Sequence, residues 1–249
     1  MKIDALSYNI HKGFSPLNRK FTLHDIKAFF KSTHADIVFL QEVVGENQHH
    51  ANSVGQWPDN SQYEFLADEL WPHHAYAKNA VYEKRHHGNV ILSKYPIIET
   101  NQINISKNQW EKRGILFARL EMPDGKHLDT YCVHLNLLGK DRALQYADLR
   151  RIIKHYSSNR PIILAGDFND WNRKATPGLA ALGIHDAYKR VHGHYAKTFP
   201  SLFPLVPLDR CYTNLEVVNA KVLYEWSNPL LSDHCPILLE VKYDAHKGL

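Results

Sequence analysis

The feature that most constrains the fold of this chain is an unbroken apolar run that ends in glycine and then in polar side chains. Residues 162–170 read Ile-Ile-Leu-Ala-Gly-Asp-Phe-Asn-Asp. Such a run is typical of a strand covered on both faces, and Gly166 permits a close backbone approach. If the backbone stays extended, Asp167 and Asn169 point to the same small volume, where they could orient a water molecule or hold a phosphoryl oxygen. The same residues also favour an ordinary Asx turn.

Polar side chains flank other predicted strands in the same way. The ends that carry them are Asn9 near the end of residues 2–10, Glu42 after residues 36–40, His134 with Asn136, Asp167 with Asn169, Asp209 at the start of residues 208–213, and Asp233-His234 before residues 235–243. Hard oxygen ligands and imidazoles gathered from six ends indicate one shared site for a divalent metal and an anionic ester.

The remaining pattern contains more strands than helices. Helical spacing predicts helices over residues 22–31, 63–70 and 142–157. Further strands are expected over residues 88–93, 95–98, 114–121, 127–136 and 217–226, with a hairpin turn at Pro123–Gly125 and a long polar loop over residues 45–62. A mixed sheet or a pair of sheets flanked by helices fits this order best, and a doubly wound parallel sheet is the second choice.

The amino-acid composition limits the class of protein but does not indicate a particular ligand. The chain has 249 residues, of which 44% are hydrophobic, and a formal net charge of +4. It lacks an internal linker or repeat, so we expect a single domain over residues 1–249. The charge is compatible with an anionic substrate but is smaller than that of a dedicated nucleic-acid binder.

Cys132, Cys211 and Cys235 lie in apolar segments and predict buried free thiols. Without a signal peptide or an apolar span, a cytoplasmic protein is expected.

The ordered motifs resemble those of the metal-dependent endonuclease/exonuclease/phosphatase superfamily. This superfamily includes pancreatic-type deoxyribonuclease, exonuclease III-like repair nucleases, inositol polyphosphate phosphatases and neutral sphingomyelinases. The motifs are Ser7–Asn9, Leu40–Val43, Val133–Asn136, Ala165–Asn169, Leu208-Asp209 and Ser232–Pro236. Segments 57–59, 86–89 and 111–114 place the chain closest to a bacterial branch of unassigned substrate. The resemblance implies an α/β fold, a four-layer αββα sandwich of two mixed, mainly antiparallel sheets flanked by helices.

The resemblance also implies a role for each motif residue. Glu42 would be the principal ligand of Mg²⁺ or Mn²⁺, with Asn9 and Asp233 close to the metal or its waters. Asp167 would accept the proton of the attacking water, and Asn169 would position that water or a phosphate oxygen. His234, held by Asp209, would face the scissile phosphate, and His134 could assist the leaving oxygen.

Other residues have weaker assignments. His11, Asn136, Arg113 and Arg142 are candidates for binding the substrate phosphate, although an ordinary ion pair explains either arginine as well. His11 replaces an acidic residue of the abasic-site repair enzymes, and Arg210 replaces an aromatic one, which argues against that activity. The pairs His49-His50, His73-His74 and His86-His87 could suggest zinc, but adjacent side chains rarely chelate from a strand, so loop histidines are the better interpretation.

The expected activity is hydrolysis of a phosphodiester, or more broadly a phosphoester, by water that Asp167 activates. Two stretches suit the rim of such a site. Trp57, Tyr63 and Trp71 form the first, and Phe199 with the apolar residues 202–206 forms the second, which either packs as a loop or meets a lipid headgroup region. The preferred substrate is therefore a lipid-linked or small organic phosphoester, with transient contact to membrane lipid and no obligate protein partner. DNA or RNA is the close alternative, and a non-catalytic phosphate-binding module is the second alternative.

Overall fold

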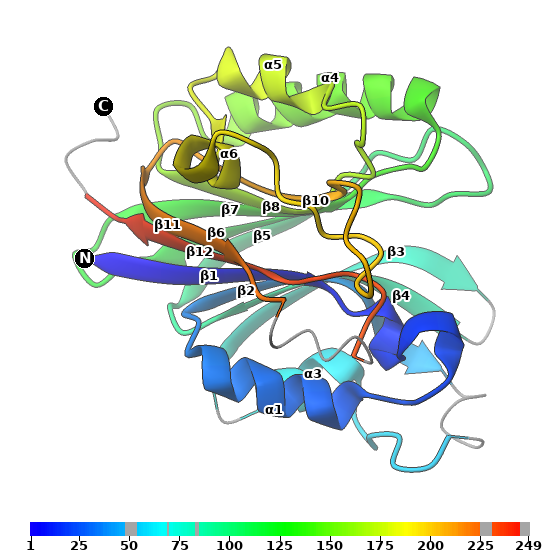
Figure 1. Ribbon diagram of the computed structural model, residues 1–249. Helices are drawn as coiled ribbons and strands as arrows, with labels where there is room; N and C mark the ends of the chain where they lie inside the picture. Colours follow the sequence, from blue (N-terminus) through cyan, green and yellow to red (C-terminus); the bar gives the residue numbers. More distant parts are fainter. Residues whose placement is uncertain (48–53, 69, 83–84, 225–230, 245–249) are drawn as a thin grey trace.

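Two six-stranded sheets pack face to face between outer layers of helices (Figure 1). The structure, a computed structural model, describes residues 1–47, 54–68, 70–82, 85–224 and 231–244. The first sheet has the order β11 (Glu216–Val222), β12 (Ile237–Lys242), β1 (Lys2–Asn9), β2 (Ile37–Asn47), β4 (Arg85–Ser93) and β3 (His73–Tyr82). The second has the order β5 (Ile97–Asn104), β6 (Gly114–Glu121), β7 (His127–His134), β8 (Ile162–Asp167), β10 (Asp209–Thr213) and β9 (His185–Asp186).

The sheets are mixed and mainly antiparallel, which confirms the fold class expected from the sequence. The pairs β1–β2 and β7–β8 are parallel, and the other paired strands run antiparallel. The core between the sheets contains Phe39, Ile91 and Leu116, all 2% exposed or less. This core is continuous across the two sheets.

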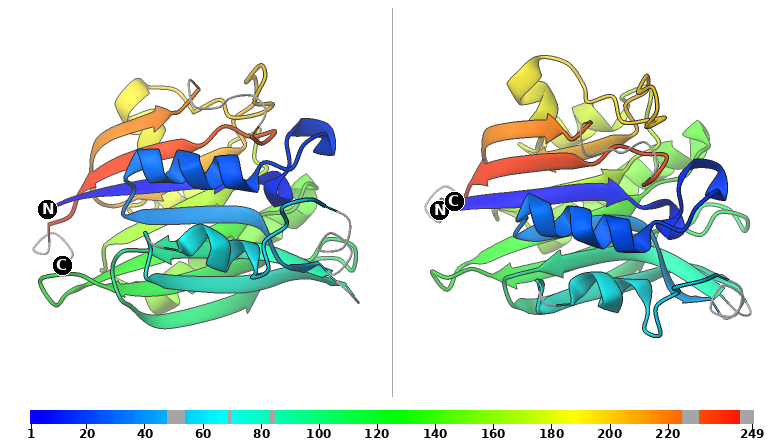
Figure 2. Two further views of the ribbon diagram at one scale, coloured as in Figure 1. Left: turned by 90° about the horizontal axis from the view of Figure 1, so that it is seen from below. Right: turned by 60° about the horizontal axis from the view of Figure 1, so that its bottom comes forward.

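Helices cover the outer faces of both sheets. The helices α1 (Leu23–Thr33) and α3 (Gln62–Ala67) lie on the first sheet, as both views of Figure 2 show, and α4 (Gly139–Tyr156) and α5 (Ala175–Ala180) lie on the second. The short α6 (Ala187–His192) follows β9 and contacts β10 and β11. Two single 3-10 turns, η1 (His11–Gly13) and η2 (Pro16–Asn18), follow β1.

Local sequence explains the main helices and the central hairpin. Leu23, Ile26, Phe29 and Phe30 form the buried face of α1, whose spacing predicted the helix. A capping box at Ser61 starts α3. The predicted turn between β6 and β7 is present, with the backbone N–H of Gly125 donating to the carbonyl of Met122 at 2.8 Å.

Several predicted boundaries were wrong, because polar strands carry no apolar pattern. The strand β2 was expected to end at Leu40 but runs to Asn47, so the predicted polar loop is strand at its start. The strands β3 and β9 and the helices α5 and α6 were not predicted. The interpretation of His73-His74 and His86-His87 as loop histidines was also wrong, since they lie in β3 and β4. These strands pair through backbone hydrogen bonds that do not depend on side-chain polarity.

At the C-terminal end the strand β11 stops at Val222, whereas residues 217–226 were expected to be extended. Residues 225 and 226 of that prediction lie outside the described residues. Cys132, Cys211 and Cys235 are buried free thiols, as predicted. Among the described helices, none combines the length and the apolar composition that a transmembrane span requires.

Candidate active site

The polar strand ends meet at one edge of the sandwich, called here the site edge, where β1, β7 and β8 end and β10 begins. His134 pairs with Asp167 across the parallel β7–β8 ladder, and Asp209 pairs with Asp167 across the antiparallel β8–β10 ladder. Strand register therefore places the ends of three neighbouring strands side by side. Asn9 joins them from the other sheet, since its Nδ2 donates to Asp167 Oδ2 at 3.2 Å.

Asp167 is the centre of this arrangement. Its carboxylate is buried, with Oδ2 lying 3.5 Å from His134 Nε2 and 3.8 Å from His234 Nε2. Burial raises the pKa of Asp167 to about 6, with His234 opposing the rise and Asp209 adding to it. A carboxyl group with that pKa can exchange a proton near neutral pH.

The loop after Asp167 departs from the extended path that the sequence allowed. Asn169 has φ of +49°, and its backbone N–H donates to Asp167 Oδ1 at 2.9 Å in an Asx turn. Its side-chain Nδ2 donates to the carbonyl of Leu135 at 3.0 Å. The extended backbone on which a common direction for Asp167 and Asn169 depended is therefore absent, because the strand ends at Asp167. The Asx turn named as the alternative forms there.

Gly166 lets the two central strands approach each other. Its φ is +145°, and a Cβ at this position would lie 2.0 Å from the carbonyl oxygen of Val133. No other residue type fits such a contact without moving β7.

His234 and Asp209 form a buried pair. Asp209 Oδ2 lies 2.8 Å from His234 Nδ1, so the Nε2 side of the ring faces Asp167. Burial lowers the pKa of His234, but the charge and hydrogen bond of Asp209 outweigh it and raise the pKa to about 10. His234 therefore carries a positive charge at neutral pH. The Phe199 ring packs against it at a centroid distance of 5.0 Å.

Glu42 reaches the site from a bulge and not from a strand end. The β2–β4 register shifts between Leu40 and Val43, and Glu42 has φ of +58°. A bulge re-aims a side chain and is common beside active sites. Burial raises the pKa of Glu42, but His134, Lys12 and His11 together lower it well below its usual range. Lys12 Nζ lies 3.0 Å from Glu42 Oε2.

Asp233 approaches the same side of the site through His11. The His11 Nδ1 atom lies 3.4 Å from Asp233 Oδ1, and the His11 backbone N–H donates to Asn9 Oδ1 at 3.1 Å. Ser232 Oγ donates to the carbonyl of Asn9 at 2.7 Å, which joins the turn before β12 to the end of β1.

The donors present suit a hard divalent cation. Glu42, Asn9 and Asp233 offer carboxylate and amide oxygens, the ligand type that Mg²⁺ and Mn²⁺ prefer. The Lys12 ammonium against Glu42 shows that this carboxylate already attracts a cation. A second group, Asp167, Asp209 and His234, has ligand atoms within 4.8 Å of one another and could also hold a metal ion. In that group, however, Asp209 is already bonded to His234.

Arg142 and Asn136 occupy positions beneath the site. The Asn136 amide exchanges hydrogen bonds with Gln145 and Asp141, and Arg142 Nη1 donates to the carbonyl of Asn136 at 2.9 Å. The Arg142 guanidinium also lies 4.7 Å from the ring centroid of Trp171. Through these contacts both residues hold the loop after β7. The phosphate-binding assignment did not include this structural role.

The charge of Arg113 affects the neighbouring His134 imidazole. Arg113 Nη2 pairs with Glu111 at 2.9 Å, which is the ion pair considered as its alternative role. Burial lowers the pKa of His134 well below its usual value, and the Arg113 charge lowers it further. His134 is therefore a neutral imidazole beside the charged His234.

Sequence reasoning did not single out Lys12, and it noted Arg210 only as a departure from the family pattern. Lys12 follows His11 at a strand exit, and that position was the available signal. Arg210 is 1% exposed, lies 3.4 Å from Asp186 Oδ2 and donates to the carbonyl of Asp170 at 3.1 Å. It is thus a structural arginine behind the site.

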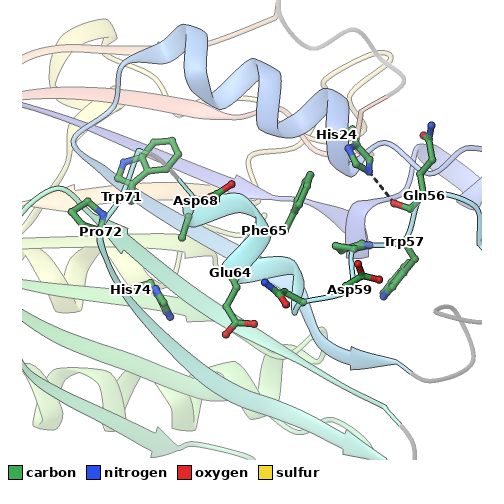
Figure 3. A pocket seen from close by; sticks show the side chains of 13 residues that line it. His24, Gln56, Trp57, Asp59, Glu64, Phe65, Asp68, Trp71, Pro72 and His74 are labelled. Atoms are coloured by element: carbon green, nitrogen blue, oxygen red, sulfur yellow. Dashed lines mark hydrogen bonds between the residues drawn. The ribbon is translucent and has the colours of Figure 1, made fainter.

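The first proposed rim stretch packs against the outer helices. Trp71 is buried and donates to the carbonyl of Ala35, Tyr63 stacks on Tyr76, and Trp57 stacks on Phe21. Trp57 and Trp71 line a hollow of about 930 Å³ beside α1 and α3, with Phe65 between them (Figure 3). His73, His74, His86 and His87 take no part in the metal-ligand group found among the described residues, and His49-His50 lie outside them.

The chain is similar to known proteins over most of its length. The model of the endonuclease/exonuclease/phosphatase family matches residues 6–234. The chain is 42% identical over 242 residues to the Escherichia coli K12 protein YbhP, itself uncharacterized, covering 95% of each chain.

Solved structures share the fold at low identity. A functionally unknown conserved protein from Enterococcus faecalis V583 superposes with a TM-score of 0.77 at 17% identity, over 97% of this chain and 100% of that one. D. rerio TDP2 complexed with a single-strand DNA product superposes with a TM-score of 0.71 at 18% identity, over 97% and 99%.

Proposed function

The chain belongs to the endonuclease/exonuclease/phosphatase family, and on that premise we propose that it is a divalent-metal-dependent hydrolase of phosphoester bonds, most readily phosphodiesters. We assign this activity to one catalytic domain over residues 1–249. The observation that carries the proposal is the convergence of Asn9, His134 and His234 on one oxygen of Asp167.

In this proposal Asp167 accepts the proton of the attacking water. Its pKa of about 6 leaves it ionised at neutral pH and basic enough to take the proton. The Asn169 backbone N–H holds Oδ1, so Oδ2 is the oxygen that faces the reacting water.

His234 and His134 take different roles because their charges differ. The protonated His234, fixed by Asp209, donates from Nε2 to a non-bridging phosphate oxygen and offsets its developing negative charge. The neutral His134, whose Nε2 lies 3.5 Å from Asp167 Oδ2, assists the leaving oxygen.

Glu42, Asn9 and Asp233 would hold Mg²⁺ or Mn²⁺. When bound, the cation supplies charge stabilisation of the phosphoryl oxygens. His11 and Lys12, which lie against Asp233 and Glu42, would then be free to contact the substrate phosphate.

We propose a lipid-linked or small organic phosphoester as the substrate. The apolar loop that contains Phe199 supports this choice, since it packs against His234. Single-stranded nucleic acid is the alternative, which the likeness to a DNA-bound structure favours.

A direct assay tests the reaction class. Purified protein should release nitrophenol from bis(4-nitrophenyl) phosphate with Mg²⁺ or Mn²⁺, and EDTA should abolish the release. Binding of phosphate compounds without turnover of any phosphoester would instead support a phosphate-binding module. Parallel assays on phospholipid vesicles, inositol phosphates, plasmid DNA and single-stranded RNA would separate the substrate classes.

A further inference from the structure

Large apolar side chains are exposed on the loops of the site edge, where the candidate active site lies. They come from four segments of the site edge: the connection from β5 to β6, the segment after β7, the segment after β8, and the loop before β10. The apolar collar is defined as Trp110, Leu137, Trp171, Leu202, Phe203 and Leu205.

The exposure of these residues is high for their size. Trp110 is 90% exposed, and Leu202 and Phe203 are 68% and 69% exposed. Single exposed apolar residues are common, but a group gathered from separate segments at one functional edge marks an interaction surface.

Hydrogen bonds and a cation–π contact connect the segments of the collar with one another and with the site. The Leu137 backbone N–H donates to Glu111, the neighbour of Trp110. Arg142 donates to the carbonyl of Leu137 and lies over the Trp171 ring. On the other side of the mouth, the Ser201 backbone N–H donates to the carbonyl of Asp233 at 2.7 Å. The gold segment before β10 in Figure 1 runs to this edge.

A basic surface adjoins the collar at Leu205. Arg173, Lys189 and Lys197 line a cavity of about 470 Å³ together with Leu205 and Tyr195. The Arg173 and Lys189 charges lie 5.3 Å and 4.8 Å from the Tyr195 ring centroid. None of the three cations has an ion-pair partner in the part of the chain that the structure describes.

We propose that the site edge docks on an anionic phospholipid bilayer, with the apolar collar entering the interface and the basic surface contacting lipid phosphates. An anionic bilayer binds protein surfaces that combine exposed leucine, tryptophan and phenylalanine with nearby unpaired lysine and arginine. Single-stranded nucleic acid fits less well, because Leu137, Leu202 and Leu205 have no ring on which a base can stack.

This docking deepens the proposed function, on which it rests for its biological sense, since it brings the mouth of the site to phosphoesters in the membrane. Its test is independent of turnover. Binding is measured by co-sedimentation in EDTA with vesicles of phosphatidylcholine and with vesicles of phosphatidylcholine and phosphatidylglycerol in equal parts.

The chain should bind the anionic vesicles, and the double variant Leu202→Ser/Phe203→Ser should bind them at least about tenfold more weakly because two apolar insertions are lost. The triple variant Arg173→Gln/Lys189→Gln/Lys197→Gln should lose the preference for anionic vesicles. The matched control Ile98→Ser/Val218→Ser removes exposed apolar residues at the opposite end of the sheets and should bind as the original chain does. Circular dichroism confirms that each variant is folded.

Absence of vesicle binding, or equal losses in the collar variant and its control, would overturn the docking. Binding of a single-stranded oligonucleotide that depends on the collar, without vesicle binding, would overturn it in favour of nucleic acid. Turnover of bis(4-nitrophenyl) phosphate without vesicle binding would refute the docking alone, whereas vesicle binding without any turnover would refute the proposed hydrolase alone.

Discussion

Single residues in this site differ in charge because their partners differ. His134 and His234 both face Asp167, yet Arg113 adds to the burial that keeps the first neutral, while Asp209 keeps the second protonated. Two imidazoles with opposite protonation around one carboxylate can divide the work of proton transfer and charge stabilisation.

Removing one charge from the site should slow turnover strongly without unfolding the protein. Asp167→Asn and Glu42→Gln should each lower kcat by about 10²–10⁴-fold, since each removes a base or a charge that stabilises the transition state. Steady-state assays with bis(4-nitrophenyl) phosphate measure the loss. Glu240→Gln, at the opposite end of β12 where it pairs with Lys2, is the matched control. Full metal-dependent activity in either site variant would refute the role assigned to that residue.

The pair of His234 and Asp209 should make stability depend on pH. The pKa of His234 is raised from 6.5 to about 10 in the folded chain, so its contribution is fully present below pH 6.5 and is lost as pH rises to about 10. Asp209→Asn should therefore lower the free energy of unfolding at pH 6 by about 1.5–3 kcal/mol, the value of a hydrogen bond to a charged group. The difference between the two proteins should shrink as the pH approaches 10. Urea unfolding across this range measures it, and a difference that grows with pH would contradict the assignment.

At the scale of secondary structure, two irregular backbone positions place side chains in the candidate site. The bulge in β2 turns Glu42 toward the site, and the Asx turn after β8 fixes Asp167. Both positions need left-handed backbone, at Glu42 and Asn169, which costs conformational energy that regular strand would not. The elements around them are regular and well buried.

Gly166 is the element-scale position most sensitive to change. In Gly166→Ala the new Cβ would meet the Val133 carbonyl at 2.0 Å, so β7 and β8 must separate. We expect a loss of about 3 kcal/mol or more in the free energy of unfolding, as for overpacking combined with a strained φ. Denaturant titration measures the loss. Gly55→Ala, where nothing lies within 4 Å of the added Cβ, should change it by less than about 0.5 kcal/mol.

At the scale of the whole molecule, the core between the sheets holds the two halves of the site in place. Asn9, Glu42 and Asp233 come from the first sheet and its turns, and Asp167 and Asp209 come from the second. The site is therefore intact only when the sheets are packed together.

Substitution of two phenylalanines should distinguish a core position from an exposed position by the change in unfolding free energy. Phe39→Ala, in the core between the sheets, should cost about 3–5 kcal/mol of unfolding free energy. Phe203→Ala, at a side chain 69% exposed, should cost less than about 0.5 kcal/mol. Thermal and urea unfolding compare the two. A comparable loss in both would show that Phe203 belongs to the packed structure and not to an exposed collar.

The amino-acid sequence by itself determined the local features: the apolar runs of β1, β6, β7 and β8, the amphipathic helices α1 and α4, and the polar residues at the strand ends. These follow from periodicity and turn chemistry, which act over a few residues. The family was evident for the same reason, since its motifs are short and stand in order.

Only the tertiary structure decided how those residues meet. Strand register sets Asp209 opposite Asp167, the bulge at Glu42 brings in Lys12, and exposed side chains from four separate segments lie at one edge. Arg142 and Asn136, predicted as phosphate ligands, also hold the loop after β7 through hydrogen bonds, because buried polar groups must satisfy one another. These pairings join residues that are separated in the chain, by as many as 158 positions for Asn9 and Asp167. The energy that selects the pairings between the sheets comes from packing the two sheets together, which no local pattern contains.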